Sequence, residues 1–337
     1  MSLPPSEIPQ GAIRFNTDSQ KLEFYAQGEW WVMSTDTPNL GRGVDSTPGA
    51  RGLFGGGYAA PSVRSQIDAI NISSTGDAFD FGDLSASRYA AAAGADKTKA
   101  VWGGGSSTST TIDNIEFSSQ GTAVSFGSLS VGRRGASACS SATRTIFAGG
   151  VGSPTYVSTV DYITTQSGGT AVNFGDSLHN ILSNTGALSS STRGLFAGGQ
   201  APPTIYNIIE FVTISTTGLL SDFGDLVQTQ IDSIGCSNST RGLFGGGLTP
   251  TKVNTIQYVT IATTGNAVDF GDLTRTMQHG NACSSPVRGV WMGGAVPDTD
   301  VIDYVNIATQ GNAVDFGNLN LARWSGNSGC SNAHGGL

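Results

Sequence analysis

Apolar residues in this chain come in short runs that end in glycine, and one such run recurs six times. Each copy opens on a basic residue, continues through three mostly apolar residues and ends in two or three glycines. The copies are residues 51–57, 99–105, 144–150, 193–199, 241–247 and 288–294. Their first residues are 48, 45, 49, 48 and 47 positions apart. A fixed period of this length is typical of propellers and solenoids.

Each repeat predicts four short strands. The glycine run suits a strand buried on both faces, and a second strand follows with alternating pattern, as in 256–261. After a glycine turn, a third strand ends in Phe-Gly-Asp-Leu, as at 270–273. The fourth strand is small and polar, as in 133–141. Four strands in each of six repeats predict an all-β chain whose residues 51–337 form a six-bladed β-propeller.

The repeat also resembles the kelch motif, which has an apolar run ending in Gly-Gly, a Tyr or Phe in the next strand and an aromatic residue closing the blade. Phe in Phe-Gly-Asp-Leu stands where kelch repeats usually have Trp, so the form is divergent. The resemblance implies that the fourth strand of each repeat is the inner strand of the next blade. We expect residues 322–332 to pair with the run at Arg51 and close the ring. Residues 41–46 are the alternative closing strand.

Residues 1–37 stand outside the repeat and predict a small β-module. Residues 13–25 alternate apolar and polar on either side of turn-forming 16–20, which indicates a hairpin, and 30–33 predict a third strand. Residues 38–50 are a linker rich in Pro, Gly, Ser and Asp. Because isolated hairpins are only marginally stable, we expect the module to use its aromatic residues for attachment or oligomerisation. These are Phe15, Phe24, Tyr25, Trp30 and Trp31.

The same stretch resembles a short module common in bacteriophage tail-fibre and other virion proteins, of the form Gly-x-Ile-Arg-Phe-Asn-Thr…Leu-Glu-x-Tyr…Trp. The matching residues are Gly11, Ile13, Arg14, Phe15, Asn16, Thr17, Leu22, Glu23, Tyr25 and Trp30. The resemblance implies a phage virion component assembled in the host cytoplasm, namely a tail fibre or spike, with other virion proteins as partners. Fibre proteins with such modules are often trimers, so a homotrimer is the first expectation. A capsid or tail decoration protein without receptor binding is the alternative, and a glycan-active enzyme is the third.

Composition and charge exclude several classes of partner. Of 337 residues 48 are glycine, only 12% are charged and the net charge is −8. A negative balance argues against a nucleic-acid partner, which needs a basic surface. No apolar run is long enough to cross a bilayer and no leader is recognisable, so we expect a soluble protein without membrane insertion or a cleaved signal.

Residues that could carry chemistry have structural explanations. The aspartates of the Phe-Gly-Asp-Leu corners recur in repeat after repeat, whereas a catalytic pair occurs once. We expect them to cap turns or to pair with arginines a few residues on, such as Arg88, Arg275 and Arg323. The recurring pairs are Asp80 with Asp83, Asp222 with Asp225, and Asp269 with Asp272.

Cysteine and histidine give no sign of a metal site. The four cysteines, at 139, 236, 283 and 330, fall at matching places of their repeats, which predicts buried free thiols too far apart for disulfides. The three histidines, His179, His279 and His334, have no metal-ligand spacing. We therefore expect no catalytic residues, no metal, no cofactor and no enzyme activity.

The loop after each glycine run differs in every repeat, and there a propeller can specialise. These loops contain Tyr, Pro, Ser and Thr but few charges. Aromatic faces and hydroxyl groups suit sugars, so we expect this face to bind a neutral or weakly charged glycan of the host surface. Tyr58, Tyr156 and Tyr206 are the candidate stacking residues. Unconstrained drift of the loops is the alternative interpretation.

Overall fold

The computed structural model describes residues 8–9, 11–16, 21–32, 51–153, 155–178 and 185–337. The chain is all-β: these residues contain no α-helix, and a 3₁₀ turn, η2 (Ser106–Thr108), is their only helical element. No helix among them could span a membrane. The chain divides into two compact units, residues 1–47 and 48–337.

The first unit is a three-stranded antiparallel sheet of β1 (Ile13–Asn16), β2 (Lys21–Ala26) and β3 (Glu29–Val32), in that order. Gln27 and Gly28 connect β2 to β3 with φ values of 56° and 87°. Two successive residues in the left-handed region match the twist of a tight hairpin. The predicted hairpin and third strand are therefore confirmed.

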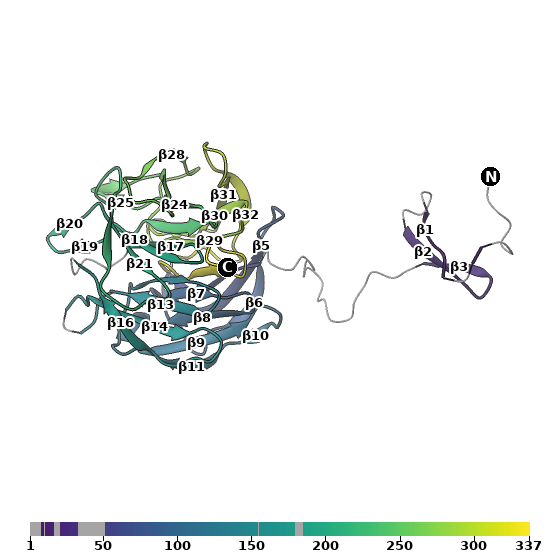
Figure 1. Cartoon of the computed structure of the whole chain (residues 1–337), viewed down its shortest axis with the longest axis horizontal. Coiled ribbons are helices and arrows are strands. Elements are labelled where there is room, and N and C mark those ends of the chain that lie inside the picture. The colour runs from purple at the N-terminus through teal and green to yellow at the C-terminus, as the bar shows by residue number, and fades with distance from the viewer. Residues whose placement is uncertain (1–7, 10, 17–20, 33–50, 154, 179–184) are drawn as a thin grey trace. The chain divides into compact units, whose positions relative to one another are not determined.

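Six sheets of the second unit, within the described ranges, share a set of four antiparallel strands in the same order. Figure 1 colours these strands by residue number. The first sheet is β33 (Gly329–Ser331), β4 (Arg51–Ala59), β5 (Ser62–Asn71) and β6 (Phe79–Asp83). The second is β7 (Ala92–Ala95), β8 (Lys99–Gly103), β9 (Thr111–Glu116) and β11 (Val124–Ser128). The third is β12 (Ser137–Ser140), β13 (Arg144–Ala148), β14 (Thr159–Thr164) and β16 (Val172–Asp176).

The other three sheets follow the same plan. The fourth is β17 (Gly186–Ser189), β18 (Arg193–Ala197), β21 (Ile208–Thr213) and β22 (Ser221–Asp225). The fifth is β23 (Ile234–Ser237), β24 (Arg241–Gly245), β27 (Thr255–Thr260) and β28 (Val268–Asp272). The sixth is β29 (Asn281–Ser284), β30 (Arg288–Met292), β31 (Val301–Asn306) and β32 (Val314–Asn318).

Short strands complete the unit. β10 (Gly121–Thr122) and β15 (Gly169–Thr170) pair in parallel with β6 and β11 of the preceding sheets. Two loop hairpins are β19 (Gln200–Ala201) with β20 (Thr204–Ile205), and β25 (Leu248–Thr249) with β26 (Thr251–Lys252). A Cβ atom on Gly82 would lie 1.7 Å from the Gly121 carbonyl oxygen. The glycine of Phe-Gly-Asp is therefore needed where one repeat touches the next.

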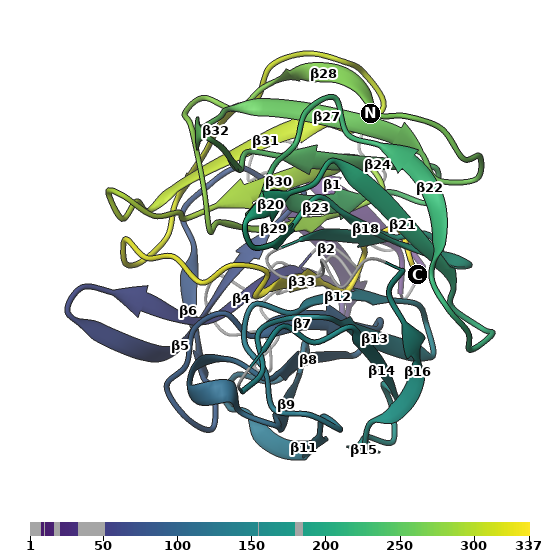
Figure 2. The ribbon, with the colours of Figure 1, turned by 90° about the vertical axis from the view of Figure 1, so that its left-hand side faces the viewer.

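The first strand of each sheet, here called the inner strand, lies toward the middle of the unit (Figure 2). Each inner strand contacts the next in the cycle β7, β12, β17, β23, β29, β33 and back to β7. Serine hydroxyl groups link them: Ser189 Oγ donates to the Ser140 carbonyl at 2.7 Å and Ser237 Oγ to the Ser189 carbonyl at 2.7 Å. Ser284 and Ser331 continue the series. Close approach between neighbouring inner strands thus explains why the fourth strand of the repeat has small polar residues.

The C-terminal strand supplies the inner strand of the first sheet. β33 pairs with β4, Gly329 opposite Phe54, so the predicted use of the 322–332 segment is confirmed for its strand residues. The alternative segment, 41–46, lies outside the described residues. Every other inner strand is likewise the fourth strand of the preceding repeat, as β7 on β8.

The basic residue that opens each repeat joins neighbouring sheets. The guanidinium of Arg144 lies 4.6 Å from the ring centroid of Tyr162 and donates to the Ile214 carbonyl of the next sheet at 3.0 Å. Arg288 of the sixth sheet donates in the same way to the Ile72 carbonyl of the first sheet at 3.0 Å. A positive charge over an aromatic face is favourable. These contacts therefore explain why each repeat begins with a basic residue.

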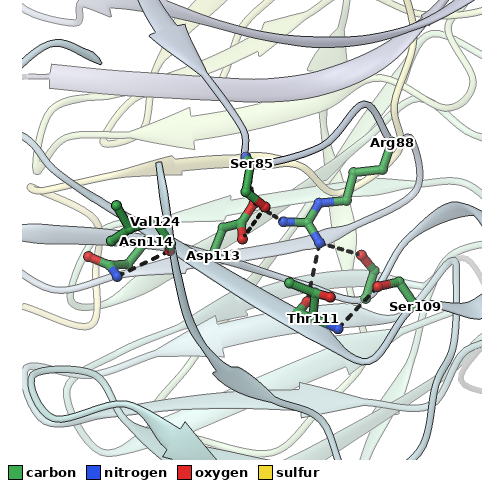
Figure 3. A network of polar contacts seen from close by, with 8 residues as sticks. Ser85, Arg88, Ser109, Thr111, Asp113, Asn114 and Val124 are labelled. Carbon is green, nitrogen blue, oxygen red and sulfur yellow. Dashed lines mark hydrogen bonds and ion pairs between the residues drawn. The ribbon is translucent and has the colours of Figure 1, made fainter. Parts of the chain in front are cut away.

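Buried ion pairs form a second set of contacts between repeats, and they correct one expectation. Arg88 pairs with Asp113 of the next sheet, and the Ser85 hydroxyl donates to the same carboxylate (Figure 3). Arg275 and Arg323 pair with Asp303 and Asp68. The predicted pairing of these arginines with the Phe-Gly-Asp-Leu aspartates is wrong, because a carboxylate on the second strand lies within reach of each guanidinium.

At the first of these corners, one aspartate caps its own turn and the other contacts the neighbouring strand β5. Asp80 Oδ1 accepts the Gly82 backbone N–H at 3.1 Å, and Asp83 Oδ1 accepts the Ser65 hydroxyl at 2.8 Å. Both side chains are exposed. The predicted turn-capping role is therefore found at this corner.

Candidate functional site

A pocket of about 250 Å³ lies at one end of the inner strands. Its floor is made of residues that precede these strands and have left-handed φ values of 53–66°. They are Ala90, Gly135, Asp232, His279 and Gly326. Its wall includes Val151, Tyr156 and Gln200 from the loops that differ between repeats. The pocket therefore combines a backbone conformation that recurs between repeats with side chains that differ between repeats.

Aromatic rings gather on one side of the pocket around Trp324. Its ring centroid lies 5.1 Å from Tyr89, 5.6 Å from Tyr58 and 5.1 Å from the imidazole of His279. Tyr58 N–H donates to the Trp324 carbonyl at 2.7 Å, and Trp324 N–H donates back to Tyr58 at 3.1 Å. The backbone contact that joins the C-terminal segment to the first repeat thus also fixes Trp324. All four side chains are partly exposed.

His279 and Asp232 form a polar pair within the pocket. Nδ1 of His279 lies 3.1 Å from Oδ1 of Asp232, whose side chain is only 3% exposed. The two residues precede neighbouring inner strands, β29 and β23. The contact of Nδ1 with the carboxylate fixes the orientation of the imidazole ring, which also lies against Trp324.

Arg134 supplies a positive charge at the rim. Its backbone exchanges two hydrogen bonds with Val151, at 3.0 and 2.7 Å, which hold the residue in place. Its exposed side chain reaches the Tyr89 hydroxyl at 3.5 Å, and we find no ion pair for it in the described part of the chain. The preceding residue, Arg133, is by contrast fully buried against Asp161 at 2.9 Å.

The other end of the inner strands is closed by the C-terminal residues. Gly335 N–H donates to the Ser237 carbonyl at 3.0 Å, and His334 Nε2 donates to the Ala95 carbonyl at 2.9 Å. His334 Nδ1 accepts the Gly336 N–H at 3.1 Å, and burial lowers the pKa of the imidazole, so the ring is neutral. This end is a structural closure.

The four cysteines lie beside this closure and are buried and unpaired, as predicted. Burial raises the pKa of the Cys139 thiol. The pKa values of Cys236, Cys283 and Cys330 are raised for the same reason. Since the thiolate is the nucleophile and the metal ligand, these residues act as apolar packing. Among the described residues we find no group of three His, Cys, Asp or Glu side chains that could hold a metal.

The three tyrosines proposed from the sequence are not equivalent. Tyr156 lines the pocket, and Tyr58 packs on Trp324 beside it. Tyr206 is not among the described lining residues; its N–H donates to the Gly199 carbonyl at 3.0 Å. The structure therefore brings Tyr58 and Tyr156 near one site and leaves Tyr206 away from the lining.

The five aromatic residues proposed for attachment divide between the two faces of the N-terminal sheet. Phe15, Phe24 and Trp31 are exposed on one face, together with Ile13, because Ile13, Phe24 and Trp31 lie opposite one another. On the other face Tyr25 is 4% exposed and packs at 5.3 Å against Trp30. Arg14 lies over Trp30 and pairs with Glu23 at 2.9 Å.

Sequence reasoning missed Tyr89, Asp232, His279 and Trp324. All four belong to the fourth-strand segment of the repeat, which was interpreted as scaffold. A signal was present: the floor position reads Ala90, Gly135, Asp232 and His279 in four of the described repeats, and the residue before it also changes from repeat to repeat.

In comparisons with known proteins, no family model and no curated protein matches this chain. A functional assignment therefore depends on the residues and the geometry of the pocket.

Proposed function

We propose that residues 51–337 form a six-bladed, kelch-like β-propeller that binds a saccharide of a host cell surface in the pocket around Trp324. The propeller is supported by six sheets of one strand order and by inner strands that contact each other in a cycle. It is supported also by the link from Arg288 in the sixth sheet to Ile72 in the first.

The observation that carries the binding proposal is the aromatic cluster. Trp324 and Tyr89 remain partly exposed in a pocket, although comparable aromatic residues such as Trp102 and Trp291 are fully buried. Sugars present apolar C–H faces to aromatic rings and hydroxyl groups to polar side chains. His279 lies against Trp324, and Gln200 is another polar side chain of the lining.

The protein's place is proposed to be the virion, as a tail fibre or spike. The support is the resemblance of the N-terminal module to phage tail-fibre modules, with Ile13, Phe15, Phe24 and Trp31 forming its exposed apolar face. That face would attach the protein to other virion proteins or to copies of itself, a homotrimer first. Several copies tolerate a weak single site because avidity multiplies affinity. In this proposal the protein needs no cofactor and catalyses no reaction.

A saccharide array tests the binding proposal. The full chain should retain surface polysaccharides of bacteria, and Trp324→Ala should lose most of that binding. Tyr206→Ala is the matched control, since Tyr206 lies outside the described lining, and it should bind as the native chain does. Unchanged binding by a folded Trp324→Ala protein contradicts the assignment of the pocket.

Electron microscopy of labelled phage particles tests the virion role. A label at fibre or spike tips agrees with the proposal. A label spread over the capsid or tail, with no retained polysaccharide, indicates the alternative decoration protein.

A further inference from the structure

We propose that the ligand of this pocket is an acidic saccharide, with a sugar ring against Trp324 and a carboxylate on Arg134. This inference rests on the proposed saccharide-binding function and adds the chemical class of the ligand. It narrows the neutral or weakly charged glycan predicted from the loops to one that carries a carboxylate.

The guanidinium of Arg134 differs from those of nearly all other arginines in the described ranges, because it binds neither a carboxylate nor a backbone carbonyl of the protein. Ten of these twelve arginines bind a carboxylate or a backbone carbonyl of the scaffold. They are Arg14, Arg51, Arg88, Arg133, Arg144, Arg193, Arg241, Arg275, Arg288 and Arg323. The eleventh, Arg64, is not among the residues that line the pocket. Arg134 reaches only the Tyr89 hydroxyl, at 3.5 Å.

The position of Arg134 within its repeat also lacks a scaffold explanation. The corresponding residue before other inner strands is Tyr89, Ile231, Gln278 or Trp324. A residue that the repeat does not require, held at the rim by two backbone bonds to Val151, is available for a ligand.

The charges of the pocket favour an anion at this point. Asp232 is the carboxylate among the described lining residues, and its Oδ1 lies against His279. Arg134 is the cation of the exposed rim. A guanidinium presents a planar fork of donors that fits a carboxylate in a bidentate way.

Tyr89 connects the two contact points. Its ring lies 5.1 Å from Trp324, and its hydroxyl lies 3.5 Å from Arg134. A sugar ring against Trp324 therefore has the guanidinium within reach of a substituent. The volume of about 250 Å³ is below the roughly 300–1,000 Å³ of drug-sized ligand sites, which suits a short saccharide segment.

Carboxylated probes and their methyl esters test this inference, because esterification removes the charge and keeps the sugar ring. Trigalacturonate, a hyaluronan tetrasaccharide and a sialic acid trimer, each beside its ester, are titrated calorimetrically into the full chain. At least one acid should bind at least about tenfold more tightly than its ester, as hydrogen bonds to charged groups predict. Arg134→Gln should abolish that difference.

The matched control is Lys97→Gln, which removes one positive charge at the exposed turn after β7. It should keep the preference for the acid, since Lys97 is not a lining residue. Loss of the preference in both variants would mean that net charge, and not Arg134, is responsible, and would overturn the inference.

Two further outcomes distinguish a failure of the acidic-ligand inference from a failure of the proposed saccharide binding. Equal binding of acid and ester, with loss of both in Trp324→Ala, overturns the acidic class and leaves saccharide binding in place. Failure of acids, esters and the polysaccharide array alike overturns the proposed function, and the inference falls with it.

Discussion

The amide of Gln257 donates to Oε1 of Gln230 at 2.9 Å, in the place where other sheets pair an arginine with a carboxylate. Both side chains are fully buried. Gln257 Oε1 also accepts the Val227 N–H at 2.6 Å, as Asp161 accepts the Ser130 N–H at 3.2 Å in the third sheet. Both members of the pair have changed together, so a neutral pair satisfies the same backbone groups without a buried charge.

This relationship predicts a compensated double substitution. Arg133→Gln alone leaves Asp161 buried without its cation and should cost roughly 3–5 kcal/mol of unfolding free energy. Adding Asp161→Gln should recover most of the loss, because the result reproduces the Gln230–Gln257 pair. Urea denaturation of the two variants measures this. A double variant as unstable as the single one would show that the sites are not interchangeable.

The pairing of the C-terminal strand β33 with β4 of the first sheet predicts that truncation of the C-terminus destabilises the whole second unit. Deleting residues 322–337 removes β33 from β4 and the Arg323–Asp68 ion pair. The melting temperature of the remaining sheets should fall strongly, since each depends on its neighbours. Removal of residues 1–37 is the control and should leave the main melting transition unchanged, because they belong to the separate unit. Equal melting temperatures for both truncations would contradict a stabilising role of the β33–β4 pairing.

The third strand of the repeat offers a pair of substitutions with opposite expectations. Phe270 is buried against Tyr258 at 6.0 Å, and Phe270→Ala should cost roughly 3–5 kcal/mol. Val268 on the same strand is 52% exposed, and Val268→Ala should change stability by less than about 0.5 kcal/mol. Chemical denaturation compares the two, and similar losses would contradict the difference in burial between the two side chains.

The buried thiols predict a loss of stability in alkali. Burial raises the folded-state pKa of Cys139 above the unfolded value of about 8.5, so above that pH the unfolded chain loses a proton that the folded chain keeps. The contribution of each buried thiol to the free energy of unfolding is therefore fully present below about pH 8.5. It falls as the pH rises, by up to about 1.4 kcal/mol per pH unit for each thiol. Cys139→Ala should reduce the slope of stability against pH between about 8.5 and 10. An unchanged slope would exclude this thiol as a cause.

The exposed face of the N-terminal sheet predicts self-association. The full chain should scatter light as a trimer, and a chain starting at Thr47 should scatter as a monomer. Phe15→Ser, on the exposed face, should weaken association, because burial of that ring would be lost. A monomeric full chain would leave only attachment to a different protein.

The strands and their order within each repeat can be predicted from the amino-acid sequence. Apolar and polar alternation, glycine runs and Phe-Gly-Asp-Leu corners act over a few residues, because strand periodicity and turn geometry are local properties of the chain. This is why β27 and β28 were predictable from residues 256–273. The assignment of the 322–332 segment to the first sheet also followed, since a regular repeat leaves one strand to be supplied from its end.

The contacts between side chains of different repeats depend on tertiary packing and could not be predicted in this way. Arg88 pairs with Asp113 and not with Asp83, because the strand of the next sheet approaches the guanidinium more closely than its own corner does. Trp324 meets Tyr58 across 266 positions of sequence (324 − 58), and His279 meets Asp232 across 47 (279 − 232). Local patterns carry no information on such distances in sequence. The pocket exists because segments that precede five of the described inner strands end at one place, and their contacts depend on sheet packing.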